Sequence, residues 1–170
     1  MSRARLGLLA GLVLLAAPVA AQPPAVGTAF GAWRLRCEAV AVGETACFLV
    51  QTLIRADTGA LLAELLALPS PVAGAVLVAR VPLGVHLPGG LHLADPDAGR
   101  LSFAWLACST ALCEATLQLD ADAVARLDAA AGLRLSYRPV AGAEVLAFDT
   151  VFSGLADGLA ALRDALPGTE

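Results

Sequence analysis

The sequence predicts an all-β fold, a sandwich or barrel of roughly eight or nine short strands accompanied by two short helices. Short segments in which apolar and polar residues alternate recur along the chain, as in strands that bury one face. Clusters of Gly, Pro and Asp separate nearly all of these segments and are typical of turns. Two segments, near 120–131 and near 154–166, break this rhythm and favour helix instead.

The first expected strand covers residues 31–37, which alternate strictly. One face is apolar and the other basic, with Trp33, Leu35 and Cys37 on the first and Arg34 and Arg36 on the second. A second strand is expected over 46–53, after a connection that contains Gly43, so that the two strands form a hairpin.

Arg34 and Arg36 are a candidate interaction surface, because two guanidinium groups on one strand face could bind an anionic group. The alternative is the solvated side of a sheet, on which Glu38 or Glu44 pairs with them.

The remaining expected strands cover residues 61–68, 75–81, 91–94, 101–106, 114–119, 133–138 and 144–150. The segment 61–68 is rich in Ala, Leu and Glu, which favour helix, and is assigned as a strand from its context. The apolar stretch 59–79 resembles a membrane span, but it contains Glu64 and two Pro residues. Two buried strands joined by a Pro-Ser-Pro turn explain it better.

Both helices have recognisable ends. The first begins at Asp120 or Asp122, either of which can act as an N-cap, and stops at Gly132. In the second, leucines recur at intervals of a helical turn after Ser153, the expected N-cap, and Pro167-Gly168 ends the helix. The leucines of this stripe are Leu155, Leu159, Leu162 and Leu166.

The N-terminus has the pattern of a cleaved export signal. Residues 1–21 contain two Arg, an apolar run and a small-residue stretch, and cleavage is expected after Ala21. A Pro-rich leader, 22–29, then precedes a single domain, 30–170. Apart from this signal, no stable membrane insertion is expected, and the protein is expected to work in the periplasm, at the cell surface or as a secreted protein.

Composition excludes several function classes. The net charge is −4 and becomes more negative once the two signal-peptide Arg residues are removed, which argues against nucleic acid as a partner. The chain contains no Lys, so it has neither a Schiff-base lysine nor the lysine of a phosphate-binding loop. No cofactor is expected.

The four cysteines form two close pairs, and they follow an export signal that directs the protein to an oxidising compartment, where disulfides form. Four cysteines allow three connectivities; proximity and hairpin geometry favour Cys37 with Cys47 and Cys108 with Cys113. A zinc site usually needs closer ligand spacing. A redox-active pair is a further alternative, although there is no Cys-x-x-Cys motif.

Catalytic and metal-binding patterns are weak. His86 and His92, followed by Asp95 and Asp97, form a cluster that could bind a metal or act as a base, but the Pro-Gly-Gly between the histidines does not fix them on one face. If Leu91 and Leu93 face the core, then His92 points to solvent. No Ser lies in the Gly-x-Ser-x-Gly elbow of a serine hydrolase. We therefore expect neither a catalytic site nor a metal site.

The order of landmarks along the chain resembles the invasion associated locus B family of small exported bacterial proteins. The landmarks are Trp33-x3-Cys37, Cys47 with Gln51, Pro82-Leu83-Gly84-Val85, Leu87-Pro88-Gly89-Gly90, Cys108 to Cys113-Glu114-Ala115, and Ser153-Gly154-Leu155. Two positions depart from the family pattern: Leu112, where Gly is common, and Leu155, where an aromatic residue is common.

The resemblance implies an immunoglobulin-like β-sandwich that is exported to the periplasm or cell surface, in a family named for a role in host-cell invasion. We therefore expect a non-enzymatic protein-interaction module linked to host-cell invasion, virulence or envelope function. The expected partner is an envelope or host protein. An alternative from another class is a periplasmic carrier of a small apolar ligand held between the sheets, which the high content of Ala, Leu and Val favours.

Overall fold

The computed structural model describes residues 24–72 and 74–165. Over these residues the strands are β1 (Ala29–Phe30), β2 (Trp33–Ala41), β3 (Glu44–Ile54), β4 (Leu61–Pro69), β5 (Ala75–Pro82), β6 (Leu91–Asp95), β7 (Gly99–Cys108), β8 (Leu112–Leu119), β9 (Leu133–Tyr137) and β10 (Leu146–Thr150). The helices are α1 (Ala121–Ala129) and α2 (Leu155–Ala165), and η1 (Leu87–Gly89) is one turn of 3-10 helix.

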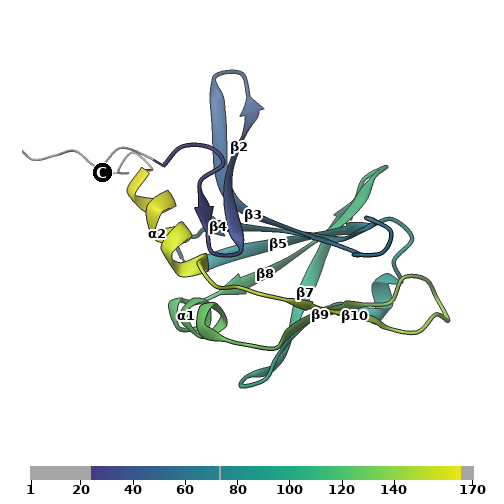
Figure 1. The fold of residues 1–170 in the computed structure, drawn as a ribbon. Helices are drawn as coiled ribbons and strands as arrows, with labels where there is room; N and C mark the ends of the chain where they lie inside the picture. The colour runs from purple at the N-terminus through teal and green to yellow at the C-terminus, as the bar shows by residue number, and fades with distance from the viewer. Residues whose placement is uncertain (1–23, 73, 166–170) are drawn as a thin grey trace, which may run out of the picture.

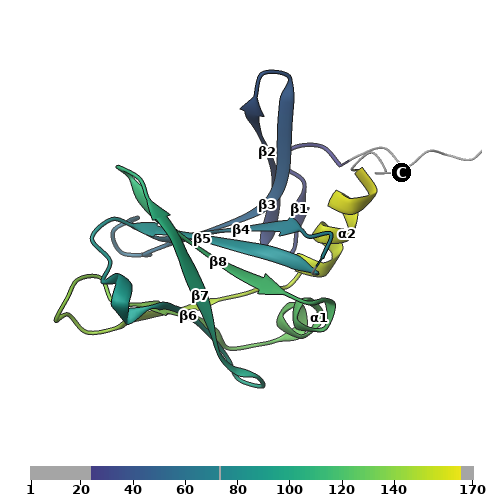
Figure 2. The ribbon, with the colours of Figure 1, turned by 180° about the vertical axis from the view of Figure 1, so that it is seen from behind.

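The strands form one continuous antiparallel sheet in the order β1-β2-β3-β4-β5-β8-β7-β6-β9-β10, and this sheet folds over at β7. The first half of β7, up to Phe103, pairs with β6, and the second half, from Ala104, pairs with β8. A register shift between Trp105 and Ala107 marks an irregularity near the bend, as bulges often do. The sheet therefore forms two layers: the first contains β3, β4, β5 and β8, and the second, β6, β9 and β10, faces it (Figures 1 and 2).

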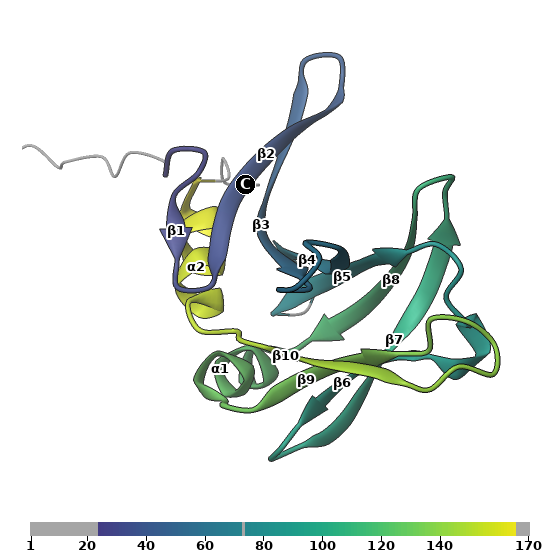
Figure 3. The ribbon, with the colours of Figure 1, turned by 45° about the vertical axis from the view of Figure 1, so that its right-hand side comes forward.

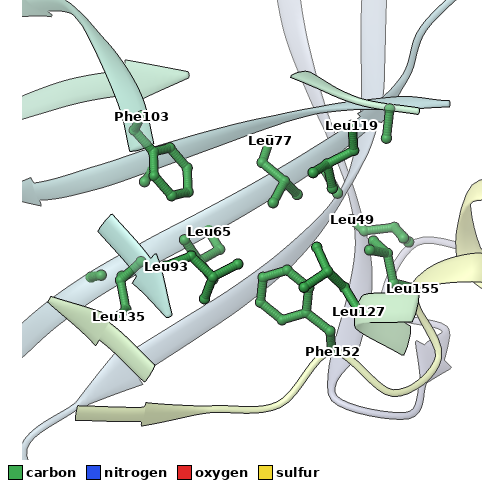
Figure 4. Packing of buried hydrophobic residues seen from close by; sticks show 14 of the residues in the cluster. Leu49, Leu65, Leu77, Leu93, Phe103, Leu119, Leu127, Leu135, Phe152 and Leu155 are labelled. Atoms are coloured by element: carbon green, nitrogen blue, oxygen red, sulfur yellow. The ribbon is translucent and has the colours of Figure 1, made fainter. Parts of the chain in front are cut away.

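The core lies between these two layers. Leu65 and Leu77 of the first layer and Leu93 and Leu135 of the second are fully buried and point toward one another (Figure 4). Each buried leucine contributes about 1.5–3 kcal/mol relative to an exposed one. The helices α1 and α2 lie together at one end of the molecule and add Leu127 and other side chains to the same core (Figure 1).

A clamp, formed by Trp33, Gln51 and the segment 150–154, joins the first strands to the segment that precedes α2. Trp33 of β2 packs edge-on against Phe152, with ring centroids 5.4 Å apart, and its indole N–H donates to the Phe152 carbonyl oxygen. The buried Gln51 of β3 donates to the Val151 carbonyl oxygen at 2.7 Å and accepts a bond from the Thr150 hydroxyl at 2.8 Å. The segment 150–154 is thereby fixed across β2 and β3.

The helix starts differ from each other. Asp120 caps α1 as expected: its Oδ1 accepts a hydrogen bond from the Ala123 amide at 2.7 Å. At α2, Ser153 was the expected N-cap, but a carboxylate oxygen of Asp128, in α1, accepts the hydrogen bond from the Ala156 amide at 3.0 Å. Because α1 packs beside α2, Asp128 of the neighbouring helix supplies the hydrogen-bond acceptor that the sequence pattern assigned to Ser153.

The predicted all-β class with two short helices is confirmed. The segments 61–68 and 75–81 are the strands β4 and β5, as predicted. The two layers belong to one bent sheet, in which most neighbouring strands are also consecutive in the sequence. The Greek-key connections of an immunoglobulin-like sandwich instead place strands side by side that are distant in the sequence. In residues 24–72 and 74–165, no helix is long and apolar enough to cross a bilayer.

The N-terminal boundary of the domain differs from the expected one. The short strand β1 was not predicted, and it straddles the expected boundary between the leader 22–29 and the domain. Leader residues Gly27 and Thr28 exchange backbone hydrogen bonds with Leu35, so this part of the leader packs on the domain. The expected signal peptide, Leu166 and the Pro167-Gly168 stop lie outside the described residues.

Candidate functional site

Two hairpins are each closed by a disulfide between directly opposed strand residues. Cys37 of β2 faces Cys47 of β3, and Cys108 of β7 faces Cys113 of β8, with Cα–Cα distances of 4.0 Å in both pairs. This is the pairing that proximity in the sequence favours. Closing such short loops contributes about 2–3 kcal/mol each in the chain-entropy model. Each bridge stiffens one hairpin and leaves the two halves of the chain unlinked.

The β2–β3 hairpin projects from the body of the protein (Figure 3). Beyond the Cys37–Cys47 bridge it carries Val40, which is 58% exposed, and Val42, which is fully exposed at the turn. Apolar side chains at the end of a rigid projection are available to a partner protein.

One edge of this hairpin also lacks a neighbouring strand. The backbone N–H and carbonyl of Leu35 point away from β3 and bond to Thr28 and Gly27. Because backbone groups in an antiparallel strand point to the same side at every second residue, those of Cys37 and Ala39 point the same way. Among the described residues, they have no backbone partner on that side. An unpaired edge of this kind can accept a strand from another chain.

A row of alternating charges crosses the outer face of the first layer. Glu64 of β4, Arg80 of β5 and Glu114 of β8 stand opposite one another in register. Arg80 Nη1 lies 3.2 Å from Glu64 Oε2, and Arg80 Nε lies 2.8 Å from Glu114 Oε1. Burial opposes the charge on Arg80, but hydrogen bonds to Glu114 and Glu64 outweigh it and raise the pKa of this guanidinium.

Arg36 extends the charge row, whereas Arg34 does not. Arg36 contacts Glu64 at 3.1 Å and Glu38 at 3.0 Å, and its guanidinium lies 5.3 Å from the centroid of the Phe48 ring. Arg34 is exposed and has no ion pair within the described residues. Of the two arginines in the candidate surface, Arg36 is therefore held in ion pairs on the sheet face, whereas Arg34 has an exposed guanidinium group.

Replacing Glu64 with glutamine should destabilise the protein by about 1–2 kcal/mol, because two guanidinium groups lose their shared carboxylate. The Glu64 side chain is 15% exposed, so solvent compensates little for the lost partner. Glu44→Gln is the matched control, since Glu44 is exposed and has no ion pair in the described residues. Urea denaturation measures both, and equal midpoints would show that the row contributes nothing to stability.

A hollow of about 420 Å³ lies where the charge row reaches the second disulfide. It is lined by Arg80, Ala107, Cys108, Ser109, Leu112 and Glu114. Arg80 and Glu114 neutralise each other at its wall, so the hollow offers no net charge to a ligand.

The histidine cluster does not assemble into a site. His92 has its ring nitrogens 3.1 Å from Ser102 Oγ and 3.2 Å from the Gly89 carbonyl oxygen. Asp95 turns inward instead, where its buried carboxylate lies 2.9 Å from Arg126 Nε. Within residues 24–72 and 74–165, no group of three or more His, Cys, Asp or Glu side chains is placed to hold a metal.

Sequence comparison assigns the family. The model of the invasion associated locus B (IalB) protein family matches residues 33–163, most of the chain. The chain belongs to the invasion associated locus B family. Among curated proteins, none matches the sequence significantly.

A solved structure shares the fold of this invasion associated locus B family protein. It is the crystal structure of invasion associated protein B from Bartonella henselae, with a TM-score of 0.65 and 19% sequence identity. The match covers 82% of this chain and 95% of that chain.

Several residues that carried the family resemblance have structural roles in this protein. Trp33, Gln51 and the turn at Ser153-Gly154 belong to the clamp between the first strands and the segment before α2. The charge row was not predicted, because its members lie far apart in sequence and meet only through strand register. The signal in the sequence was a single charged residue in each of the three strands β4, β5 and β8, at outward-facing positions.

Proposed function

We propose that this invasion associated locus B family protein is exported and acts, without catalysis, as a protein-interaction module of the bacterial cell envelope. The contact surface in this proposal is the projecting β2–β3 hairpin, defined as residues 37–47. The observation that carries the proposal is the combination, in one hairpin, of exposed valines, an unpaired strand edge and a disulfide.

A preorganised projection suits recognition. The Cys37–Cys47 bridge limits the conformations of the hairpin before binding, and this lowers the entropy cost of forming a complex. A partner strand could pair with the free edge, while Val40 and Val42 supply apolar contact. The open cation of Arg34, near the base of the hairpin, favours a partner that carries an acidic group.

Export is supported by the N-terminal pattern and by the disulfides, which persist in oxidising compartments. The proposal places the mature protein in the periplasm or at the cell surface, beginning at Gln22. N-terminal sequencing of the protein recovered from the envelope fraction tests the cleavage site.

Site-specific photo-crosslinking tests the contact surface. A photoreactive residue at position 42 in the oxidised protein, irradiated in intact bacteria, should yield a discrete crosslinked product. The same residue at Val72 is the control, because Val72 is 88% exposed but lies in the β4–β5 connection, away from the hairpin.

The Cys37→Ser/Cys47→Ser double variant should reduce the yield from position 42. Identical products from positions 42 and 72, or none from position 42, would contradict the proposed surface.

A further inference from the structure

A pocket of about 220 Å³ is lined by residues of the β3–β4 connection, the segment after β5 and the β9–β10 connection, together with the adjoining strand ends. The β3–β4 and β9–β10 connections lie at the end of the fold opposite the helices (Figure 1). Most of the residues that line the pocket are apolar. The lining apolar residues are Ala60, Leu61, Leu62, Pro82, Leu83, Val85, Pro139 and Leu146. Arg55 and Tyr137 are the polar members of the lining.

Arg55 gives this apolar pocket a positive charge. It is exposed at the rim and has no ion pair within residues 24–72 and 74–165. Arg55 lies close enough to Tyr137 to influence the pKa of the phenol. Burial raises the pKa of Tyr137, and the guanidinium charge of Arg55 opposes this rise by favouring the phenolate. The Tyr137 hydroxyl donates its hydrogen to the Leu62 carbonyl oxygen at 2.9 Å, so that hydrogen is already engaged.

We propose that this pocket binds a small carboxylate attached to an apolar body, with the carboxylate at Arg55 and the body against Leu62, Leu83 and Val85. A guanidinium can hold a carboxylate with two hydrogen bonds, and such charge-assisted bonds are the stronger kind. The site goes beyond the protein-interaction role and does not depend on it.

The size of the pocket limits the apolar body. A cavity of about 150 Å³ holds one benzene molecule, so this pocket accommodates a ring or a chain of roughly six to eight carbon atoms. A membrane lipid is too large to be enclosed. The space between the layers, where the sequence suggested an apolar ligand, is filled by the side chains of the core (Figure 4).

Titration of the oxidised protein with hexanoate tests the proposal, with calorimetry for affinity and backbone amide NMR shifts for location. Binding is expected with a dissociation constant on the order of 1 mM for a ligand of this size. Shifts should centre on Leu62, Leu83 and Val85. Hexylamine and hexanol should bind at least about fivefold more weakly, because neither carries the anion.

Two variants make the test specific. Arg55→Gln should weaken hexanoate binding about tenfold or more. Arg100→Gln should leave it unchanged, since Arg100 is also exposed and without an ion pair in the described residues but lies at the start of β7. Ala60→Phe should block the pocket, and circular dichroism checks that each variant is folded.

The source of the carboxylate is distinguished by a second ligand, an N-acetylated tripeptide ending in leucine. Tighter binding of hexanoate assigns the site to a free acid, and tighter binding of the tripeptide assigns it to a protein C-terminus; both support the recognised chemistry. Equal affinity for hexanoate and hexylamine, equal affinity of the Arg55 and Arg100 variants, or no binding of either carboxylate would overturn the proposal.

Discussion

Replacing Gly31 with alanine is expected to destabilise the protein by about 3–5 kcal/mol. Gly31 has a φ of +54°, which side chains disfavour, and an added Cβ would overlap the backbone carbonyl of Ser153. The two segments already touch here, since the Ala32 amide donates to the Ser153 carbonyl oxygen at 2.9 Å. Relief of the overlap requires the clamp of Trp33 and Gln51 to open.

Gly43→Ala is the matched control for this substitution. Gly43 has a φ of +77°, but an added Cβ there meets open space. It should cost only about 1 kcal/mol, the cost of the left-handed backbone conformation. Thermal or urea denaturation of both variants isolates the cost of the overlap between the added Cβ and the Ser153 carbonyl. Similar losses of stability in the two variants would mean that the backbone at Gly31 and Ser153 can shift to avoid this overlap.

Asp95→Asn is expected to cost about 3 kcal/mol at neutral pH, because it removes a charge partner from a buried ion pair. The Asp95 side chain is completely buried, while Arg126 keeps 34% of its side chain exposed, so water offsets part of the loss on the arginine. Asp149→Asn is the control: the Asp149–Arg134 pair is exposed on both sides and should change stability by less than about 0.5 kcal/mol.

The same pair predicts a pH dependence. Burial alone would raise the pKa of Asp95, but hydrogen bonds from Arg126 and from the amides of Asp97 and Ala98 outweigh it and lower the pKa. A lowered pKa in the folded state means that this stabilisation is complete above the unfolded value, about 3.9, and is lost as pH falls through the folded value.

The difference in unfolding free energy between the wild type and Asp95→Asn should therefore be constant from pH 5 to neutral pH and shrink as pH falls below about 4. Urea titrations across this range measure it. A difference that stays constant down to pH 2, or that grows on acidification, would contradict the assigned pair.

Local pattern was sufficient to predict most of the elements of this fold. Alternation in residues 31–37 places Trp33 and Leu35 on the buried side, as the structure does, because a strand exposes every second residue. The N-cap at Asp120 was predictable for the same reason: its hydrogen bond reaches only three residues along the chain.

Features that depend on register or on distant contacts were not predictable. Asp95 follows His92 by three residues in the sequence and therefore suggested a metal ligand, yet its partner in the structure is Arg126 of α1. Arg55 comes near Tyr137 only because the fold brings the β3–β4 connection beside β9, and Glu64 pairs with two arginines only through strand pairing. Hydrophobic pattern determines which side of a strand is buried, but not which charges meet across it.

The clamp has a consequence for the order in which the protein can form. Neighbouring strands mostly follow one another in sequence, so the meander β1 to β5 can pair as soon as it has been synthesised. The contact between Trp33 and Phe152 instead closes a loop of 119 residues, and the entropy cost of closing a loop grows with its length. The inner face of the first strands therefore stays uncovered until the segment that contains Phe152 has been synthesised. A chain that lacks this segment would expose an apolar surface around Trp33.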